Sequence, residues 1–516
     1  MIADWISNCT KDHPLCALQQ TCPKLPTRVI YVGPDSVRPN LFVTQGALGL
    51  YAALSYCWGN ARSFITTQST MSQREQGMDV ADLPRTLQDA ISVTQRLGIQ
   101  YLWIDSLCII QDSKEDWDVE ASRMCDIYAN AHVTISADTA PDSDTGFREV
   151  ATGKNVVQVS CPLSTGSELT VYARPFRNRR NAIGAHTPSA APQSRLSTRA
   201  WVLQERLLSP RLIHFTKHEV TWECNTMIQC ECEYKENKIP EQYGTFEQYD
   251  ASGQSEFKRK YLNPQFWQSI VREYTSRDLS YSSDRLAAFS GIAARLTSGV
   301  SSGYLAGLRK SHICEDLLWR TVSSKDMVNP STSRRHDAYQ APSWSWASVT
   351  GPIRYPDYFG YRKRAKDVQL DLQFEVLDTQ TMPFDSNAFG PVQNGFIDCI
   401  GVLIEAQIFT IVPDKIAQKV LPDKPSLYFC DYFRDGDEIV RETFNPDVRG
   451  DEYEIRASDQ HWVLLIKQSL EGLHGIALRK SQSDGTKFER VGYYTSPSYP
   501  WKSWWKVENM QRLTII

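Results

Sequence analysis

The sequence lacks a basic block, a long apolar run and a secretion signal. Its 56 Lys and Arg residues face 60 Asp and Glu residues, and no positive cluster is long enough to follow a phosphate backbone. No window approaches the roughly twenty apolar residues that cross a bilayer. The opening stretch "MIADWISNCTKDHPLC" lacks the basic and apolar regions of a signal peptide. These absences predict a soluble, cytoplasmic protein with no membrane span and no nucleic acid partner.

Several catalytic and metal-binding motifs are also missing. We find no glycine-rich phosphate loop, no Ser–His–Asp spacing and no repeat of solenoid length. The 13 cysteines are odd in number and dispersed, which favours buried reduced thiols over a disulfide framework. "CTKDHPLC" near the start does not have the spacing of a zinc motif, and neither does the later group His214, His218, Cys224, Cys230 and Cys232. We therefore predict no metal site.

The chain is long enough for more than one domain. A length of 516 residues exceeds a single compact core and predicts two or three domains. Its 14 Trp, 23 Tyr and 19 Phe residues indicate ordered, aromatic-rich cores. From the changes in pattern we predict an N-terminal extension at 1–45, an α/β domain at 46–225, a helical region at 226–350 and a β-rich module at 351–516.

The α/β domain is predicted from alternating strand and helix patterns. "YAALSY", "YLWID" and "HVTISA" are typical of buried strands. "DLPRTLQDAISVTQRLG" predicts a helix with Asp82 as N-cap and Gly98 at its end, and "DSKEDWDVEASRMCDIYANA" predicts a second amphipathic helix. This order predicts a parallel sheet with helices on both faces.

The second half of the chain changes from a helical period to a period of two. "FWQSIVREYTSRDLSYSSDRLAAFSGIAARL" and "EDLLWRTV" show helical spacing. From about residue 365 onward, apolar residues alternate with polar ones, as in "VQLDLQFEV", and "FIDCIGVLIEA", "HWVLLIK", "GIALRK" and "FERVGYYT" look like further strands. We expect an antiparallel β module there.

Polar residues follow the predicted strands where a parallel sheet collects its ligands. In open α/β sheets, ligands bind at the carboxyl ends of the strands, beside the change in strand order. The candidates are Ser55, Tyr56, Trp58, Gly59, Asp105, Ser106, Cys108, Ser136 and Asp138. Two alternatives stay open: Trp58 and Gly59 also suit a packed turn, and Asp105 also suits a cap on a backbone turn.

Glu205 is the most unusual acid in the sequence. It lies in "RAWVLQERLLSPRLIHF", a predicted helix and strand with mostly apolar neighbours. A carboxylate there is costly unless it is paired or functional, and Arg199 or Arg206 could pair with it. From the residues alone, Glu205 is either a structural acid paired with arginine or a catalytic residue. Glu120, beside the buried stripe of its helix, is the alternative key acid, although a structural hydrogen bond suits it better.

Three long segments resemble the fungal heterokaryon-incompatibility (HET) domain. They are "YAALSYCWGN", the stretch from "LPRTLQDAISVTQRLGIQ" to "ANAHVTISA", and "RAWVLQERLLSPRLIHF". Flanking pieces such as "LPTRVIYVG", "DRLAAFSGIA" and "APSWSWASVTG" also resemble family members. The family resemblance implies a role in allorecognition and programmed cell death.

The HET domain is in turn distantly similar to the Toll/interleukin receptor (TIR) domain. "LSYCWG" resembles the TIR segment in which a first strand ends in Ser-Tyr-Ser, and Trp201 and Glu205 match the tryptophan and catalytic glutamate of NAD-cleaving members. The resemblance implies a TIR-like, flavodoxin-like fold, Glu205 as catalytic residue, and a nucleotide cleft lined by Ser55, Tyr56, Trp58 and Asp105. The chain departs from the pattern at Val202, where TIR domains have cysteine, and by a polar insertion after the first strand.

Three functional hypotheses follow. The first is NAD glycohydrolysis, with NAD as substrate and no required cofactor. In this hypothesis Trp58 or Trp201 stacks on a ring, and the four arginines between 174 and 180 contact the pyrophosphate. The second is a non-enzymatic signalling module that associates with itself or with a second incompatibility protein. The third is an enzyme of a fungal biosynthetic pathway that uses a pocket between the domains.

Overall fold

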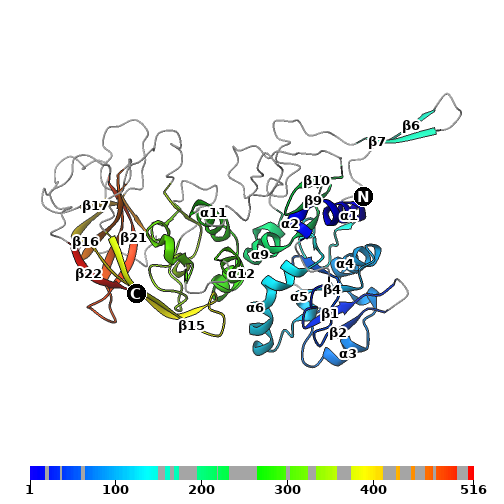
Figure 1. Cartoon of the computed structure of the whole chain (residues 1–516), viewed down its shortest axis with the longest axis horizontal. Coiled ribbons are helices and arrows are strands. Elements are labelled where there is room, and N and C mark those ends of the chain that lie inside the picture. The colour runs from blue at the N-terminus through cyan, green and yellow to red at the C-terminus, as the bar shows by residue number, and fades with distance from the viewer. Residues whose placement is uncertain are drawn as a thin grey trace. The chain divides into compact units, whose positions relative to one another are not determined.

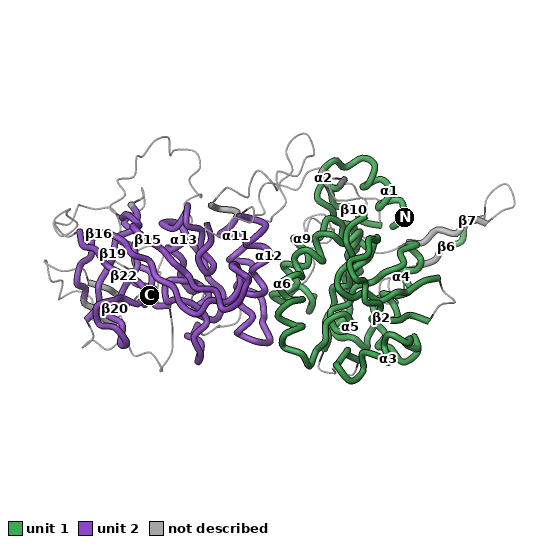
Figure 2. The backbone as a smooth tube through the Cα atoms, turned by 60° about the horizontal axis from the view of Figure 1, so that its bottom comes forward, with its two compact units in different colours: residues 1–260 green, residues 261–516 purple. Residues whose placement is uncertain are grey.

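The structure is a computed structural model of the chain. It describes residues 1–17, 22–34, 38–59, 64–148, 157–162, 168–173, 194–217, 219–231, 264–297, 303–322, 333–356, 374–410, 426–429, 443–447, 460–468, 472–496 and 510–516. The chain divides into two compact units, Met1–Lys260 and Tyr261–Ile516 (Figure 2). No helix within the described ranges has the length and apolar character needed to cross a bilayer.

The first unit is built on an eight-stranded mixed sheet with the order β10-β9-β8-β5-β3-β4-β1-β2. The strands are β1 Arg28–Tyr31, β2 Asn40–Val43, β3 Tyr51–Ser55, β4 Tyr101–Trp103, β5 Val133–Ser136, β8 Arg211–Phe215, β9 Val220–Cys224 and β10 Ile228–Cys230. The four central strands, β8, β5, β3 and β4, pair in parallel. The predicted α/β class and parallel sheet are therefore confirmed.

Helices cover both faces of this sheet. They are α4 Arg85–Arg96 between β3 and β4, α6 Lys114–Asn130 between β4 and β5, and α9 Ala200–Leu208 before β8. Figure 1 shows α6 and α9 on one face and α4 on the other. The apolar positions of α4 are buried, and Gly98 follows the helix with a φ of +71° that favours glycine. The N-cap of α4 is Pro84, while the predicted cap, Asp82, ends the preceding 3₁₀ turn Val80–Asp82.

Antiparallel strands extend the parallel core at both edges. β1 and β2 lie beyond β4, and their residues fall in the stretch predicted as an N-terminal extension. At the other edge, β9 and β10 continue the sheet beyond β8. The N-terminal helix α1, Ile2–Asp12, reaches this edge because Trp5 packs on Trp222 of β9 with ring centroids 6.3 Å apart. A short second helix, α2 Pro14–Ala17, follows it, and a two-stranded ladder of β6 Val157–Pro162 and β7 Glu168–Ala173 lies between β5 and α9 in the chain.

The second unit begins with a helical region around an aromatic core. Its main helices are α11 Pro264–Thr275 and α12 Ala287–Leu296, as the periodicity predicts. Phe289 contacts the rings of Trp267, Tyr274 and Trp346, so "SWSWAS" belongs to the same core. The helix predicted for "EDLLWRTV" is wrong beyond its start: α13, Ile313–Asp316, ends early, and β13, Arg320–Thr321, pairs with β14, Ile353–Arg354.

A second sheet completes this unit. Its strands are β15 Phe374–Pro383, β16 Val392–Thr410, β17 Ser426–Phe429, β18 Thr443–Pro446, β19 His461–Gln468, β20 Leu473–Lys480, β21 Phe488–Ser496 and β22 Met510–Ile515. The long β16 pairs with both β17 and β19, which closes the strands into a ring. The predicted antiparallel β module is confirmed for most strand pairs, but β17 pairs in parallel with β16 and with β18, and β21 pairs in parallel with β22. Side chains alternate in both kinds of pairing, so a period of two cannot distinguish them.

Candidate functional site at the carboxyl ends of the parallel strands

The candidate site lies where the order of the parallel strands changes. From β3 the chain passes to β4 on one side and then to β5 on the other. The carboxyl ends of these strands therefore flank a switch point, the usual ligand position in such sheets. Ser55 at the end of β3 pairs in register with Ser136 at the end of β5, and Asp105 follows β4 as the first residue of α5, Asp105–Cys108. The fold thus brings the predicted strand-end residues to one edge.

Glu205 is a buried acid on α9, with an exposed fraction of 5%. Burial raises the pKa of its carboxyl group to about 7, because the charged form loses its hydration. The charge of Arg199 and the nearby hydroxyls of Ser55 and Tyr128 act in the opposite direction and keep the ionised form accessible. Near neutral pH, Glu205 therefore exists in both protonation states.

Arg199 supplies positive charge at the start of α9. Its guanidinium group donates to the carbonyl oxygen of Tyr56, just past the end of β3. The same charge lowers the pKa of Glu205 and opposes the effect of burial on Asp105. Arg206, the other suggested partner of Glu205, instead pairs with Glu223, at 3.0 Å between Nε and Oε2.

Asp105 organises the turn after β4 and holds Trp58. Its carboxylate accepts from Trp58 Nε1 at 3.0 and 2.9 Å and from the backbone N–H of Ser106 at 2.7 Å. Burial raises the pKa of Asp105, and the Arg199 charge opposes that rise. Asp105 therefore accepts a hydrogen bond from the backbone of its own turn, as one of the two interpretations of the sequence predicts. Binding of a ribose by Asp105 stays a prediction.

The end of β3 contributes the remaining predicted residues. Tyr56 donates from its hydroxyl to Ser106 Oγ at 2.7 Å, and both side chains are buried. Ser55 Oγ is buried and has no partner at full hydrogen-bond geometry among the described residues. Gly59 has a φ of +75°, and a Cβ atom there would lie 2.5 Å from Asp142 Cβ. Gly59 therefore serves a tight turn and a close approach of two segments.

Two further predicted residues have packing roles. Trp201 on α9 contacts Trp117 on α6 edge to face, with centroids 6.4 Å apart. Glu120 on α6 is buried and accepts from the hydroxyl of Thr27 at 2.6 Å, with Arg123 at 3.6 Å. Glu120 thus makes the structural hydrogen bond that its place beside the apolar stripe predicts.

One small cavity borders the site at Trp58. A cavity of about 10 Å³, lined among others by Tyr56, Trp58 and Ser106, leaves room for about one water molecule. A cavity of about 810 Å³ lies elsewhere, within the second unit, and includes Arg335, Asp398 and Glu489 in its lining. A nucleotide therefore requires the cavity beside Trp58 to widen.

Sequence reasoning missed a buried charge network next to the site. His214 on β8 lies 2.9 Å from Asp138 Oδ2 through Nδ1 and 3.0 Å from Glu223 Oε2 through Nε2. Burial lowers the pKa of His214, but the two carboxylates outweigh it and raise the pKa to about 9. The sequence signal was Asp138 at a strand end together with a histidine at an inward position of "RLIHF". Tyr128, on the helix predicted from "DSKEDWDVEASRMCDIYANA", is a further neighbour of Glu205 that the sequence does not single out.

Comparison with known proteins gives one family match. The family model described as "Heterokaryon incompatibility protein (HET)" matches residues 51–205, from the first residue of β3 to Glu205. The chain therefore carries a heterokaryon incompatibility (HET) domain at residues 51–205. No curated protein and no solved structure matches it. All of the predicted site residues fall within the HET domain, whereas arginines 174–180, His218 and Cys232 lie outside the described residues.

Proposed function

We propose that the HET domain hydrolyses the N-glycosidic bond of NAD, with Glu205 as the catalytic residue. The observation that carries this proposal is the buried carboxyl group of Glu205, whose pKa of about 7 lies well above its usual range. Acidic residues whose pKa values are strongly shifted are often found at functional sites. The strand order 2-1-3-4 of the parallel core, numbered along the chain, supports the likeness to flavodoxin-like and TIR-like folds.

The reaction needs negative charge more than it needs an acid. The bond between C1′ of the ribose and the pyridinium nitrogen breaks, and its electron pair stays on nicotinamide, which leaves as a neutral molecule. Water then bonds to C1′ and releases a proton to solvent, giving ADP-ribose. The transition state carries positive charge on the ribose, so an ionised Glu205 would stabilise it.

The neighbours of Glu205 fit supporting roles in this reaction. Ser55 Oγ is buried and has no hydrogen-bond partner of normal geometry among the described residues. Its hydroxyl can therefore donate to a ribose oxygen or to the carboxylate of Glu205. The indole of Trp58, held by Asp105, offers a face for stacking on a ring. Arg199 keeps Glu205 partly ionised, which the chemistry requires.

Nicotinamide release by the full chain tests the proposal. We expect the wild-type protein at high concentration to release nicotinamide from NAD, and Glu205→Gln to lower the rate at least about 100-fold. Glu120→Gln is the matched control, since Glu120 is also a buried helical glutamate, and it should keep the wild-type rate. Because the ionised carboxylate is the active form, the wild-type rate should rise with pH around pH 7. Equal rates in wild type and Glu205→Gln would refute the role of Glu205.

A non-enzymatic signalling module is the second candidate. The cavity of about 10 Å³ and the charge of Arg199 near Glu205 favour it, because both suit a closed, structural cluster. In this case the protein would act in incompatibility and cell death through association with itself or with a second protein. Folded protein that releases no nicotinamide and gains no thermal stability from NAD would support it.

The third candidate function is that of a biosynthetic enzyme whose substrate binds in the second unit. The cavity of about 810 Å³ there is lined by charged groups, including Arg479 and Glu489, which pair at 2.9 Å. Such a cavity is within the size range of small-molecule sites. A metabolite that co-purifies with the chain, and that Glu489→Gln loses, would support this function.

A further inference from the structure

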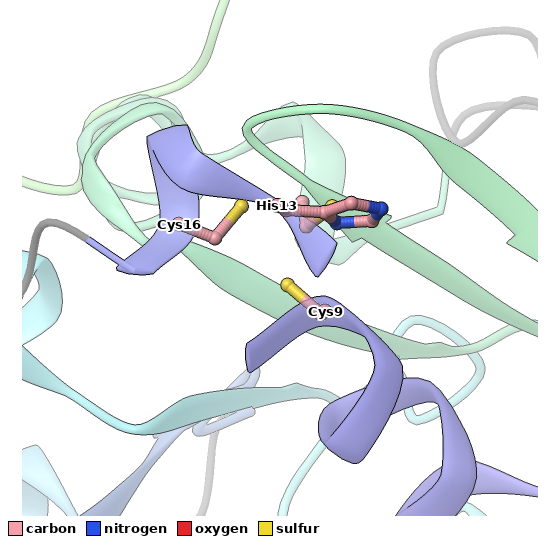
Figure 3. A group of neighbouring side chains, drawn as sticks. Cys9, His13 and Cys16 are labelled. Carbon is pink, nitrogen blue, oxygen red and sulfur yellow. The ribbon is translucent and has the colours of Figure 1, made fainter. Parts of the chain in front are cut away.

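Four potential metal ligands converge at one edge of the first unit. They are Cys9, His13, Cys16 and Cys224, and their ligand atoms all lie within 4.8 Å of one another. Figure 3 shows Cys9 and Cys16 pointing toward each other from consecutive helical segments, with the imidazole of His13 beside them. All three cysteines are buried.

The fold brings these residues together from two distant parts of the chain. Cys9 is on the last turn of α1, His13 follows that helix, and Cys16 is on α2, which starts at Pro14. Cys224 ends β9, 211 residues after His13. Besides the contact between α1 and β9, Arg211 donates to the carbonyl oxygen of Cys16 at 2.9 Å. The ligand set therefore exists only in the folded unit.

We propose that these four residues bind a structural Zn²⁺ ion. Three thiolates and one imidazole form a tetrahedral Cys₃His set, the type that holds zinc without an open position. Zinc–ligand bonds of about 2.0 to 2.3 Å place neighbouring ligand atoms about 3.5 to 3.8 Å apart. His13 Nδ1 lies 3.4 Å from Cys224 Sγ, and the limit of 4.8 Å for the whole set leaves only small side-chain rotations to complete the tetrahedron.

Neighbouring groups support thiolate charge at this site. The backbone N–H of Met227 donates to Cys224 Sγ at 3.4 Å, and Thr226 Oγ1 lies 3.7 Å from Cys16 Sγ. Hydrogen bonds of this kind orient metal ligands and offset the negative charge of three thiolates around a divalent ion. The end of β9 and the turn after it thus supply one ligand, Cys224, and two groups that contact the thiols of Cys224 and Cys16.

The site is separate from the proposed catalytic site. Cys224 pairs in register with Arg211, the first residue of β8, so it lies at the amino end of the parallel strands. Ser55 and Asp105 lie at their carboxyl ends. We assign the zinc a structural role: it fixes α1 and α2 to the edge of the sheet, and it takes no part in the chemistry at Glu205.

Metal analysis of the full chain tests this inference directly. The protein is purified without a metal-affinity tag, in reducing buffer with no added zinc. We expect about one zinc ion per chain, released when the thiols are blocked by a mercurial reagent. Replacement with Co²⁺ should give the intense visible absorption and the thiolate charge-transfer bands of a tetrahedral sulfur-rich site. Both measurements use the wild-type chain, so they do not depend on the folding of any variant.

Variants then locate the ligands. Cys16→Ser and Cys224→Ser should lose the zinc, while His13→Cys, which gives a Cys₄ set, should keep it. Cys230→Ser is the matched control, because Cys230 is a buried cysteine on the adjacent strand β10 and lies outside the cluster. It should keep about one zinc per chain.

Two results would overturn the inference. One is a wild-type chain without stoichiometric metal and without the cobalt spectrum. The other is a disulfide between any two of the three cysteines, found by mass spectrometry of the protein purified under reducing conditions. Either result leaves the proposal for Glu205 untouched, since nicotinamide release is measured separately.

Discussion

Individual residues show how burial and charge set the protonation of buried side chains in the first unit. Glu205 and His214 are both buried, yet their pKa values rise for different reasons. Burial dominates at Glu205 and disfavours its charged form. At His214 two carboxylates overcome burial and favour the charged form. At neutral pH, Glu205 is therefore partly neutral and partly negative, whereas His214 is positively charged.

The pKa of His214 predicts how stability depends on pH. It rises from 6.5 to about 9 on folding, so the contribution of His214 is complete below pH 6.5 and is lost as pH rises through about 9. We expect the free-energy difference between wild type and His214→Gln to shrink by up to about 3 kcal/mol over this range. Urea unfolding at several pH values measures it.

His132 is the control for this measurement. Burial and the charge of Arg211 lower its pKa to about 4, so it stays neutral over the same range. The difference between wild type and His132→Gln should therefore be constant between about pH 7 and about pH 10. A constant difference for His214→Gln as well would mean that His214 is neutral in the folded protein.

At the scale of elements, the turns after the central strands position the site. Gly59, directly beyond β3, lets the chain approach Asp142 in the segment after β5. Asp105 joins the turn after β4 to Trp58 in the same way, through its side chain. The site thus depends on close contacts between turns as much as on the sheet.

Substitution of Gly59 measures that dependence. Gly59→Ala should lower the free energy of unfolding by about 2 to 3 kcal/mol, because alanine disfavours a positive φ and its Cβ meets Asp142. Gly98→Ala is the matched control: its φ is also positive, at +71°, but a Cβ atom there meets nothing within 4 Å. It should cost about 1 kcal/mol. Equal losses in urea unfolding would show that the contact with Asp142 has no cost.

The same scale explains what the sequence could and could not predict. The three buried strands β3, β4 and β5 were predictable because both of their faces are covered, which gives continuous apolar runs. The antiparallel strands β1, β2, β9 and β10 were not predicted. β2 has one buried residue, and the mostly buried β1 and β9 include Arg28, Thr221 and Glu223, which interrupt the apolar pattern. The position of Glu205 on its helix and Arg199 as its possible partner were predictable, but its neighbours Ser55 and Tyr128 reach it only through tertiary packing.

At the scale of the whole molecule, two units have separate cores. The first is organised around its mixed sheet and the second around the aromatic cluster and the ring of strands. In the second unit, Arg490 is fully buried, pairs with Asp447 at 3.0 Å and stacks on Trp319 at 3.6 Å. Removing one member of a buried ion pair leaves the other charge without compensation.

Calorimetry should therefore resolve two thermal unfolding transitions, one for each unit, and a substitution in one core should shift only the transition of that unit. Arg490→Met should destabilise the second unit by about 3 to 5 kcal/mol and leave the other transition in place. Arg512→Met is the control, since Arg512 is 69% exposed and its pair with Asp398 lies at the surface. It should change neither transition by more than about 1 kcal/mol. A single transition that moves as a whole in Arg490→Met would contradict two separate cores.

The contact of Trp5 with Trp222 also has a consequence for folding during translation. Its two partners are separated by more than two hundred residues, and a ribosome adds about 5 to 20 residues per second. The nascent chain therefore exposes the apolar face of α1 for about 10 to 40 s before β9 emerges to cover it. During translation this helix is an early and lasting target for chaperones, and premature termination anywhere before β9 leaves it uncovered.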